Sequence, residues 1–143
     1  MLANRSAPPA TVTPELVYDD VEAAVEWLCR VFGFSVRWQA GDHRAQLRVG
    51  DGAVVVREEP PDVDPGAPVP GACSAVLVRV DDLGARHAHA LAAGARIVRE
   101  PGDHPYGERQ FTAQDLAGHR WTFTQSIANV APEEWGGVSG DLA

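Results

Sequence analysis

Two stretches of similar sequence decide the fold: VYDDVEAAVEWLCRVFGFSV at residues 17–36 and VRVDDLGARHAHALAAGARIV at residues 78–98. Each starts with apolar residues, continues into an aspartate that can cap a helix, and closes a helical pattern with a glycine. Asp20 and Asp82 are 62 residues apart, and the glycines follow them by 13 and 12 residues. The same signals in the same order indicate an internal repeat.

The first half predicts an extended run from Thr11 to Tyr18 and then a helix at Val21–Phe32. Val21, Val25, Leu28 and Phe32 recur at helical spacing and form one apolar face. Three strands are expected after Gly33, at residues 34–38, 45–49 and 53–58, with Gly50-Asp51-Gly52 as a hairpin turn.

The second half repeats this order. We expect a strand at residues 74–80, a helix at 83–93, and strands at 96–99, 108–113 and 119–125. A proline-rich segment separates the halves and cannot form a regular helix or a central strand. The chain therefore divides into modules 11–58 and 73–128, a linker 59–72, and tails 1–10 and 129–143.

The repeat also carries a family resemblance. Two βαβββ modules with the phrases LVYDDVEAAVEWLCRVFGF, GARIVREPGDHPYGERQFTAQDLAGHRWTF and APEEWGG resemble the vicinal oxygen chelate superfamily, which includes glyoxalases, bleomycin-resistance proteins and ring-cleaving dioxygenases. The resemblance covers about Thr11 to Gly137. It implies an α+β fold in which two tandem modules form a curved mixed sheet around a cleft, and it implies a homodimer.

The composition of the chain argues against nucleic-acid and membrane partners. The chain has 143 residues and a net charge of −8, and it lacks the clustered Lys and Arg that nucleic acid requires, so we expect no nucleic-acid partner. No apolar run approaches the roughly 20 residues of a membrane span, which predicts a cytoplasmic protein without a membrane partner. Cys29 and Cys73 have neither metal-finger nor disulfide-framework spacing.

The resemblance also locates the positions where metal-dependent relatives carry His or Glu ligands. These positions are Thr13, Ala75, Thr122 and either Val55 or Val56. None is a good ligand for a divalent cation, so we expect no metal and no cofactor. His87, His104 and His119 are interpreted as structural, hydrogen-bonded side chains, and we assign no catalytic residue.

Strand alternation predicts what lines the cavity instead. Leu16, Tyr18, Trp121 and Phe123 are expected to face the helices. The predicted ligand-binding residues are Thr13, Glu15, Trp38, Ala75, Leu77, Arg79, Tyr106, Arg120 and Thr122. Glu15 needs a partner, for which Arg79, Arg120 or a cationic ligand group are the candidates, and Trp38 is the best candidate for stacking on a flat ligand.

We therefore expect a metal-free, homodimeric protein that binds and sequesters a small organic ligand, an aromatic or cationic antibiotic. Such binding confers drug resistance or self-resistance by mass action. Two enzymatic alternatives stay open. One is a metal-dependent glyoxalase or dioxygenase type of reaction, and the other uses Glu15 as a base with Arg79 or Arg120.

Overall fold

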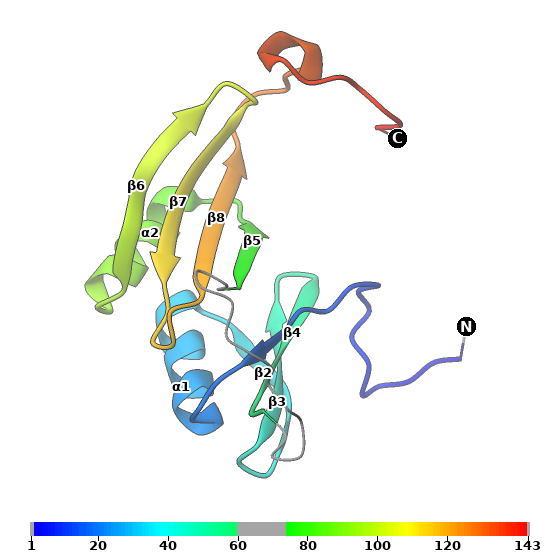
Figure 1. Ribbon diagram of the computed structural model, residues 1–143, viewed down its shortest axis with the longest axis vertical. Helices are drawn as coiled ribbons and strands as arrows, with labels where there is room; N and C mark the ends of the chain where they lie inside the picture. The colour runs from blue at the N-terminus through cyan, green and yellow to red at the C-terminus, as the bar shows by residue number, and fades with distance from the viewer. Residues whose placement is uncertain (1, 60–73, 143) are drawn as a thin grey trace, which may run out of the picture. The chain divides into compact units, whose positions relative to one another are not determined.

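The computed structural model describes residues 2–59 and 74–142, which form two compact units. The first unit contains residues 2–59, 74 and 115–119, and the second contains residues 75–114 and 120–142. Each unit holds one four-stranded sheet and one α-helix (Figure 1). The linker expected at 59–72 lies outside the described residues except for Glu59.

The first unit follows the βαβββ order. Its elements are β1 (Glu15–Val17), α1 (Val21–Phe32), β2 (Ser35–Ala40), β3 (Arg44–Val49) and β4 (Gly52–Arg57). The sheet order is β1-β4-β3-β2, with β1 parallel to β4 and the other pairs antiparallel. The helix begins directly after Asp20, whose carboxylate caps it by accepting a hydrogen bond from the Ala23 amide at 3.0 Å.

The second unit repeats that order. Its elements are β5 (Ala75–Arg79), α2 (Leu83–Ala92), β6 (Arg96–His104), β7 (Glu108–Gln114) and β8 (Arg120–Ser126), followed by a short 3₁₀ helix η1 (Pro132–Trp135). The sheet order β5-β8-β7-β6 matches that of the first unit, and Asp82 caps α2 through the Ala85 amide. The predicted α+β class and the two tandem modules are confirmed.

Two strands, β1 and β6, differ most in length from the prediction. β1 covers only Glu15–Val17, although the extended chain begins earlier, since the Pro14 carbonyl accepts a hydrogen bond from the Val55 amide. β6 runs to His104 instead of ending at Arg99, because register shifts around Val98 and between Arg99 and Gly102 absorb the Pro-Gly pair.

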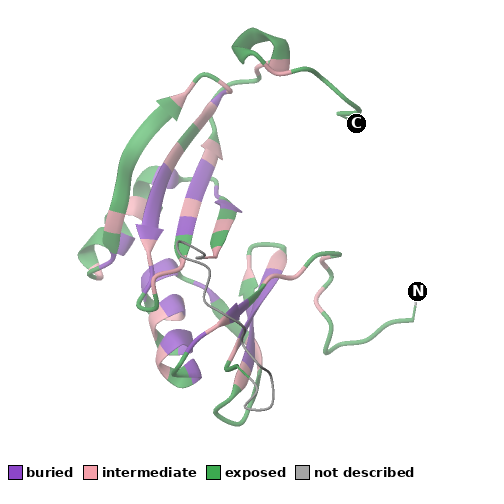
Figure 2. Ribbon diagram, viewed as in Figure 1, coloured by how far each residue is buried: buried purple, intermediate pink, exposed green. Residues whose placement is uncertain are grey.

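The core lies on one face of each sheet, as the alternation predicts (Figure 2). Leu16 and Tyr18 in the first unit, and Trp121 and Phe123 in the second, are at most 3% exposed. The other face of each sheet is less covered, and it contains most of the residues that we selected as ligand-binding.

The turn at 115–119 supplies part of the first unit's packing. The Tyr18 hydroxyl donates a hydrogen bond to Asp115 Oδ2 at 2.6 Å, and His119 Nε2 lies 2.9 Å from the Val17 carbonyl oxygen. Burial, with a smaller contribution from Asp115, raises the pKa of Tyr18 well above its usual range. His119 thus makes the structural hydrogen bond expected for it, whereas the Tyr18–Asp115 pair was not expected.

Candidate ligand-binding site

The strand registers define two faces that point away from the helices. We call them the first open face and the second open face. The first contains the paired rows Glu15–Val55–Gln46–Trp38 and Val17–Arg57–Arg44–Ala40. The second contains Ala75–Arg120–Gln114–Arg96, Leu77–Thr122–Thr112–Arg99 and Arg79–Thr124–Gln110. Seven of the nine predicted site residues therefore lie on strands of these two faces, and Thr13 and Tyr106 do not.

Glu15 on the first open face is paired within its own sheet. Its carboxylate lies 2.7 Å from an Arg44 guanidinium nitrogen and 3.4 Å from Arg57 Nε. Arg79 and Arg120, the partners that we proposed from sequence, belong to the second unit. The register places Arg57 on β4, next to β1, and Arg44 opposite it on β3, the following strand of the sheet.

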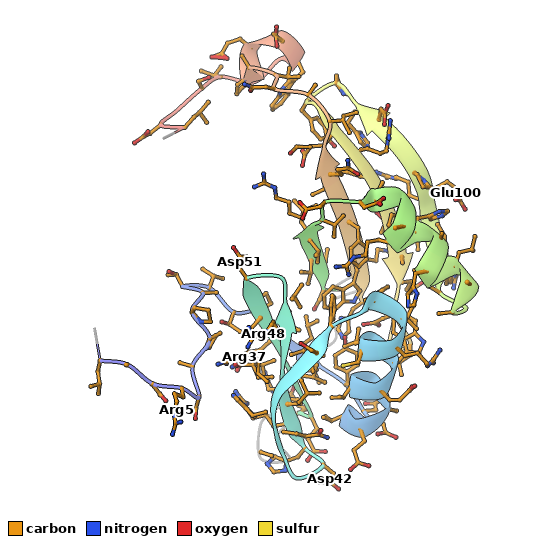
Figure 3. The ribbon with its side chains drawn as sticks, turned by 180° about the vertical axis from the view of Figure 1, so that it is seen from behind. Arg5, Arg37, Asp42, Arg48, Asp51 and Glu100 are labelled. Atoms are coloured by element: carbon orange, nitrogen blue, oxygen red, sulfur yellow. The ribbon has the colours of Figure 1, made fainter. Side chains whose placement is uncertain are left out.

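A β-bulge in β2 brings two adjacent side chains to the same side. The register shifts between Val36 and Trp38, so Arg37 is the extra residue. Arg37 donates to the Gln46 side-chain oxygen and, at 3.0 Å, to the carbonyl of Arg5; Arg5 and Arg37 are labelled in Figure 3. The Trp38 indole N–H donates to the Ser6 carbonyl at 2.9 Å. These two hydrogen bonds to backbone carbonyls hold the N-terminal segment, residues 2–13, against β2.

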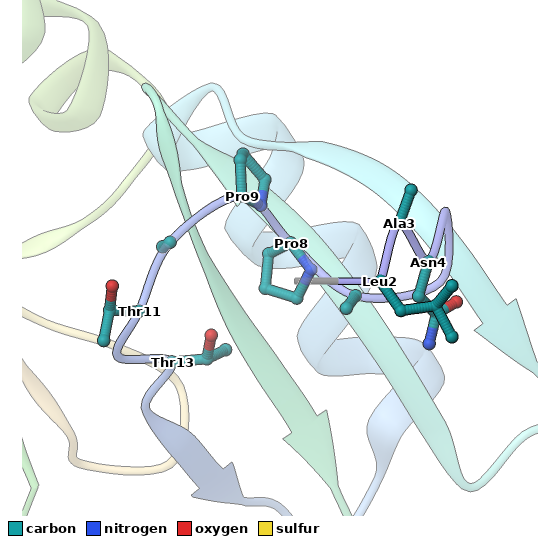
Figure 4. A pocket seen from close by; sticks show the side chains of 9 residues that line it. Leu2, Ala3, Asn4, Pro8, Pro9, Thr11 and Thr13 are labelled. Atoms are coloured by element: carbon teal, nitrogen blue, oxygen red, sulfur yellow. The ribbon is translucent and has the colours of Figure 1, made fainter.

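This segment also forms hollows. One of about 750 Å³ is lined by residues 2–4, 7–11 and Thr13, a predicted site residue (Figure 4). Another of about 470 Å³ is lined by Pro9, Arg37, Arg48 and the β3–β4 turn. Our sequence analysis treated residues 1–10 as a tail, because they lack apolar periodicity. The one sequence signal for this packing is the indole N–H of Trp38, a donor that needs a hydrogen-bond partner.

The second open face gathers three predicted residues in one pocket. Ala75, Arg120 and Thr122 line a hollow of about 170 Å³ together with Val98, Arg99 and Thr112. The Thr112 and Thr122 hydroxyls lie 2.8 Å apart and form a hydrogen bond. Leu77 is next to Thr122 in the register and is 61% exposed, and Arg79 lies further along β5. Val98 and Arg99 were missed because the bulge in β6 decides which way they point.

Tyr106 lies apart from this pocket. It stands in the β6–β7 turn, where its ring stacks on His104 with centroids 5.0 Å apart and meets Trp135 of η1 edge-on at 5.8 Å. Its hydroxyl donates a hydrogen bond to Gln110, a residue of the second open face, at 3.3 Å. Tyr106 therefore belongs to an aromatic cluster at the end of the sheet.

Comparison with known proteins identifies the family. The model of the Glyoxalase/Bleomycin resistance protein/Dioxygenase superfamily matches residues 10–123. The chain belongs to this superfamily. A crystal structure of TioX from Micromonospora sp. ML1 is 38% identical in sequence, with a TM-score of 0.70, and the alignment covers 82% of this chain and 99% of TioX.

Two other members of known structure share the fold at lower identity. TnmS3, an antibiotic binding protein from Streptomyces sp. CB03234, is 24% identical with a TM-score of 0.64, over 80% of this chain and 93% of TnmS3. A lactoylglutathione lyase from Agrobacterium tumefaciens is 18% identical with a TM-score of 0.65, over 84% and 96% of the two chains. The fold of this superfamily thus occurs both in a binding protein and in an enzyme.

The superfamily's metal chemistry needs several convergent donors, and the equivalent positions here do not fit it. The register puts Val55, not Val56, on the first open face beside Glu15, while Ala75 and Thr122 share the pocket of the second. Among residues 2–59 and 74–142, no three His, Cys, Asp or Glu side chains gather as a metal site would require. In the same residues, no helix is long and apolar enough to cross a membrane.

Proposed function

We propose that this superfamily member binds a flat organic molecule, an antibiotic or a related metabolite, on its open faces and holds it without changing its bonds. The observation that carries the proposal is the pocket of the second open face. Its lining combines the apolar surfaces of Ala75 and Val98 with hydroxyl and guanidinium donors, and contains no carboxylate or histidine. Apolar contact surface next to a few polar groups that fix orientation is a combination found in small-molecule sites.

Trp38, with Thr13 on the neighbouring N-terminal segment, supports a second contact region on the first open face. The half-buried indole has its N–H already bonded to the Ser6 carbonyl, which leaves the flat ring as the part available to a ligand. Aromatic ligands gain from such stacking beyond the area that they bury. The antibiotic-binding name of TnmS3, which shares the fold, supports an antibiotic as the ligand.

Protection from a drug by binding alone requires protein in excess of the drug and a dissociation constant below the working concentration. We infer that the protein acts in this way as a metal-free homodimer. Leu77 and Val98, both apolar and exposed on the second open face, support a further surface that covers this region.

The competing function is a metal-dependent enzyme of the superfamily. Its donor positions are occupied by Thr13, Val55, Ala75 and Thr122, which argues against it. A metal-free enzyme with Glu15 as a base is also disfavoured, because two guanidinium groups already pair with that carboxylate.

One experiment separates these functions. The purified protein is titrated with planar antibiotics by tryptophan fluorescence, and each mixture is then analysed by mass spectrometry for altered ligand. Plasma mass spectrometry measures the metal content of the same preparation. Saturable binding with unchanged ligand and without stoichiometric metal supports the proposal. Stoichiometric metal, or ligand that is converted, would make the enzyme the better explanation.

A further inference from the structure

The protein has a negative net charge, but its two open faces are positively charged. The chain carries −8 overall, and all twelve of its basic residues are arginines. Eight of these arginines lie on the two open faces, whereas the strands of these faces contribute only two carboxylates, Glu15 and Glu108. The surfaces that would meet a ligand are therefore positively charged.

The first open face contributes Arg37, Arg44, Arg48 and Arg57. Glu15 pairs with two of them, Arg44 and Arg57. Within residues 2–59 and 74–142, Arg37 and Arg48 form no ion pair with a carboxylate, although Asp51 lines the same hollow of about 470 Å³. Two guanidinium groups thus border that hollow with one nearby acid.

The second open face contributes Arg79, Arg96, Arg99 and Arg120. Glu108, the carboxylate on this face, accepts a hydrogen bond from the Thr124 hydroxyl at 2.8 Å. In the described part of the chain none of the four arginines is paired with an acid. Arg99 and Arg120 line the 170 Å³ pocket, which contains no acidic side chain.

We propose that the ligand of this protein is an aromatic anion: a flat ring system that carries a carboxylate, phenolate or sulfonate, which the unpaired arginines of the open faces bind. This inference rests on the proposed function and names its ligand class. Guanidinium groups suit this chemistry because they form charge-assisted, often bidentate hydrogen bonds with planar acidic groups and also stack on aromatic rings. The net charge alone would have favoured a cation.

The pocket of the second open face fits such a ligand in size as well. A cavity of about 150 Å³ holds benzene, so the 170 Å³ hollow accommodates one ring while the rest of the ligand extends over the open face. Ala75 and Val98 would contact that ring. Arg99, Arg120 and the threonine hydroxyls would meet its oxygen substituents.

The test uses three naphthalene probes of similar size whose single substituent is anionic, neutral or cationic: 2-naphthoate, 2-naphthylmethanol and 2-naphthylmethylammonium. Their affinities for the full chain are measured by naphthalene fluorescence anisotropy. The salt concentration is raised from about 0.1 M to about 1 M NaCl, which shortens the Debye length from about 10 Å to about 3 Å. We expect naphthoate to bind most tightly and to lose affinity with salt, and naphthylmethylammonium to bind most weakly.

Two variants assign the effect to the open faces. Arg120→Gln and Arg48→Gln are each expected to lower the affinity for naphthoate by about tenfold at the hollow that the arginine borders. The affinity for naphthylmethanol should change little. Arg30→Gln is the matched control, because Arg30 lies on α1 and pairs with Glu26. Circular dichroism and thermal melts confirm that the variants are folded.

The outcomes are distinguishable. If naphthylmethylammonium or naphthylmethanol binds as tightly as naphthoate, or if neither arginine variant changes naphthoate binding more than Arg30→Gln does, the aromatic-anion inference is overturned while small-molecule binding stands. If none of the three probes and no planar antibiotic binds, both the inference and the proposed function fail.

Discussion

Tyr18 and Asp115 form the best-defined buried polar pair in the first unit. Phe at position 18 keeps the ring but removes the donor to Asp115, whose Oδ1 still accepts from the Ala117 and His119 amides at 2.9 and 3.0 Å. A hydrogen bond to a charged group contributes about 2 kcal/mol. Tyr18→Phe should therefore lower the free energy of unfolding by about that amount at neutral pH, measured by urea denaturation.

The same pair predicts a pH dependence. Because the pKa of Tyr18 is raised in the folded protein, its contribution to stability is complete below the unfolded pKa of about 10 and is lost as the pH rises above it. The difference between wild type and Tyr18→Phe should thus shrink between about pH 8 and about pH 11. Cys29, whose pKa burial also raises, is present in both proteins and cancels. A difference that stays constant over this range would contradict the assignment.

Trp38 has two separable roles, which two substitutions distinguish. Trp38→Phe removes the indole N–H that donates to the Ser6 carbonyl but keeps a flat ring, whereas Trp38→Ala removes both. If the ring stacks on a ligand, Trp38→Ala lowers the affinity for a planar antibiotic by about tenfold, and Trp38→Phe lowers it by much less. Fluorescence or calorimetric titration measures this. Equal losses in both variants would assign Trp38 to anchoring residues 2–13 instead.

Single residues also show where sequence reasoning succeeds. Ala75, Leu77 and Thr122 were placed on the ligand side from strand alternation alone, and the register confirms that they share a face. The pairing of Glu15 with Arg44 and Arg57 was not expected from sequence, because it depends on which strands lie next to β1 in the sheet. Alternation is a local property of the chain, whereas strand order and register depend on contacts between distant residues.

The two helices are equivalent in the repeat but differ in how much they bury. α1 buries six of its residues, and α2 buries two, Leu83 and Ala90. Both depend on an aspartate cap that accepts a hydrogen bond at 3.0 Å. This pattern was predictable, since the caps and the apolar spacing are both local signals.

The caps give a matched pair of substitutions. Asp20→Ala and Asp82→Ala should each cost about 1 kcal/mol of unfolding free energy by urea denaturation. Asp82→Ala should strongly increase the hydrogen-exchange rates of the α2 backbone amides. Asp20→Ala should increase those of the α1 amides less, because tertiary packing keeps that helix folded without its cap. Equal loss of protection in the two helices would contradict the role given to burial.

The bulges in β2 and β6 explain which parts of the candidate site escaped prediction. Each inserts a register shift that turns a residue pair toward the open side: Arg37 with Trp38 in β2, and Val98 with Arg99 in β6. No local signal in β2 locates its shift, and the Pro-Gly pair of β6 follows the turned pair Val98 and Arg99 without fixing which way their side chains point. Both shifts bring an arginine to a ligand-facing hollow, so the positive charge of the open faces depends on features beyond simple alternation.

Apolar side chains of the second open face are exposed to solvent in the single chain, and this exposure is relevant to the proposed homodimer. Leu77 is 61% exposed, so its replacement by Asp removes little buried area from a single chain and should change the stability of a monomer by less than about 1 kcal/mol. In a homodimer that covers this face, the same change would bury an unpaired carboxylate and weaken association strongly.

Sedimentation equilibrium of wild type and Leu77→Asp therefore tests the homodimer. We expect wild type to have twice the 15.3 kDa chain mass and Leu77→Asp to dissociate at the same concentration. Leu91→Asp is the control, since Leu91 is a leucine of similar exposure, 53%, on α2. A wild-type mass of one chain would exclude the dimer. A dimer that persists in Leu77→Asp would show that Leu77 stays open in the assembly, and the face would then be left for the ligand alone.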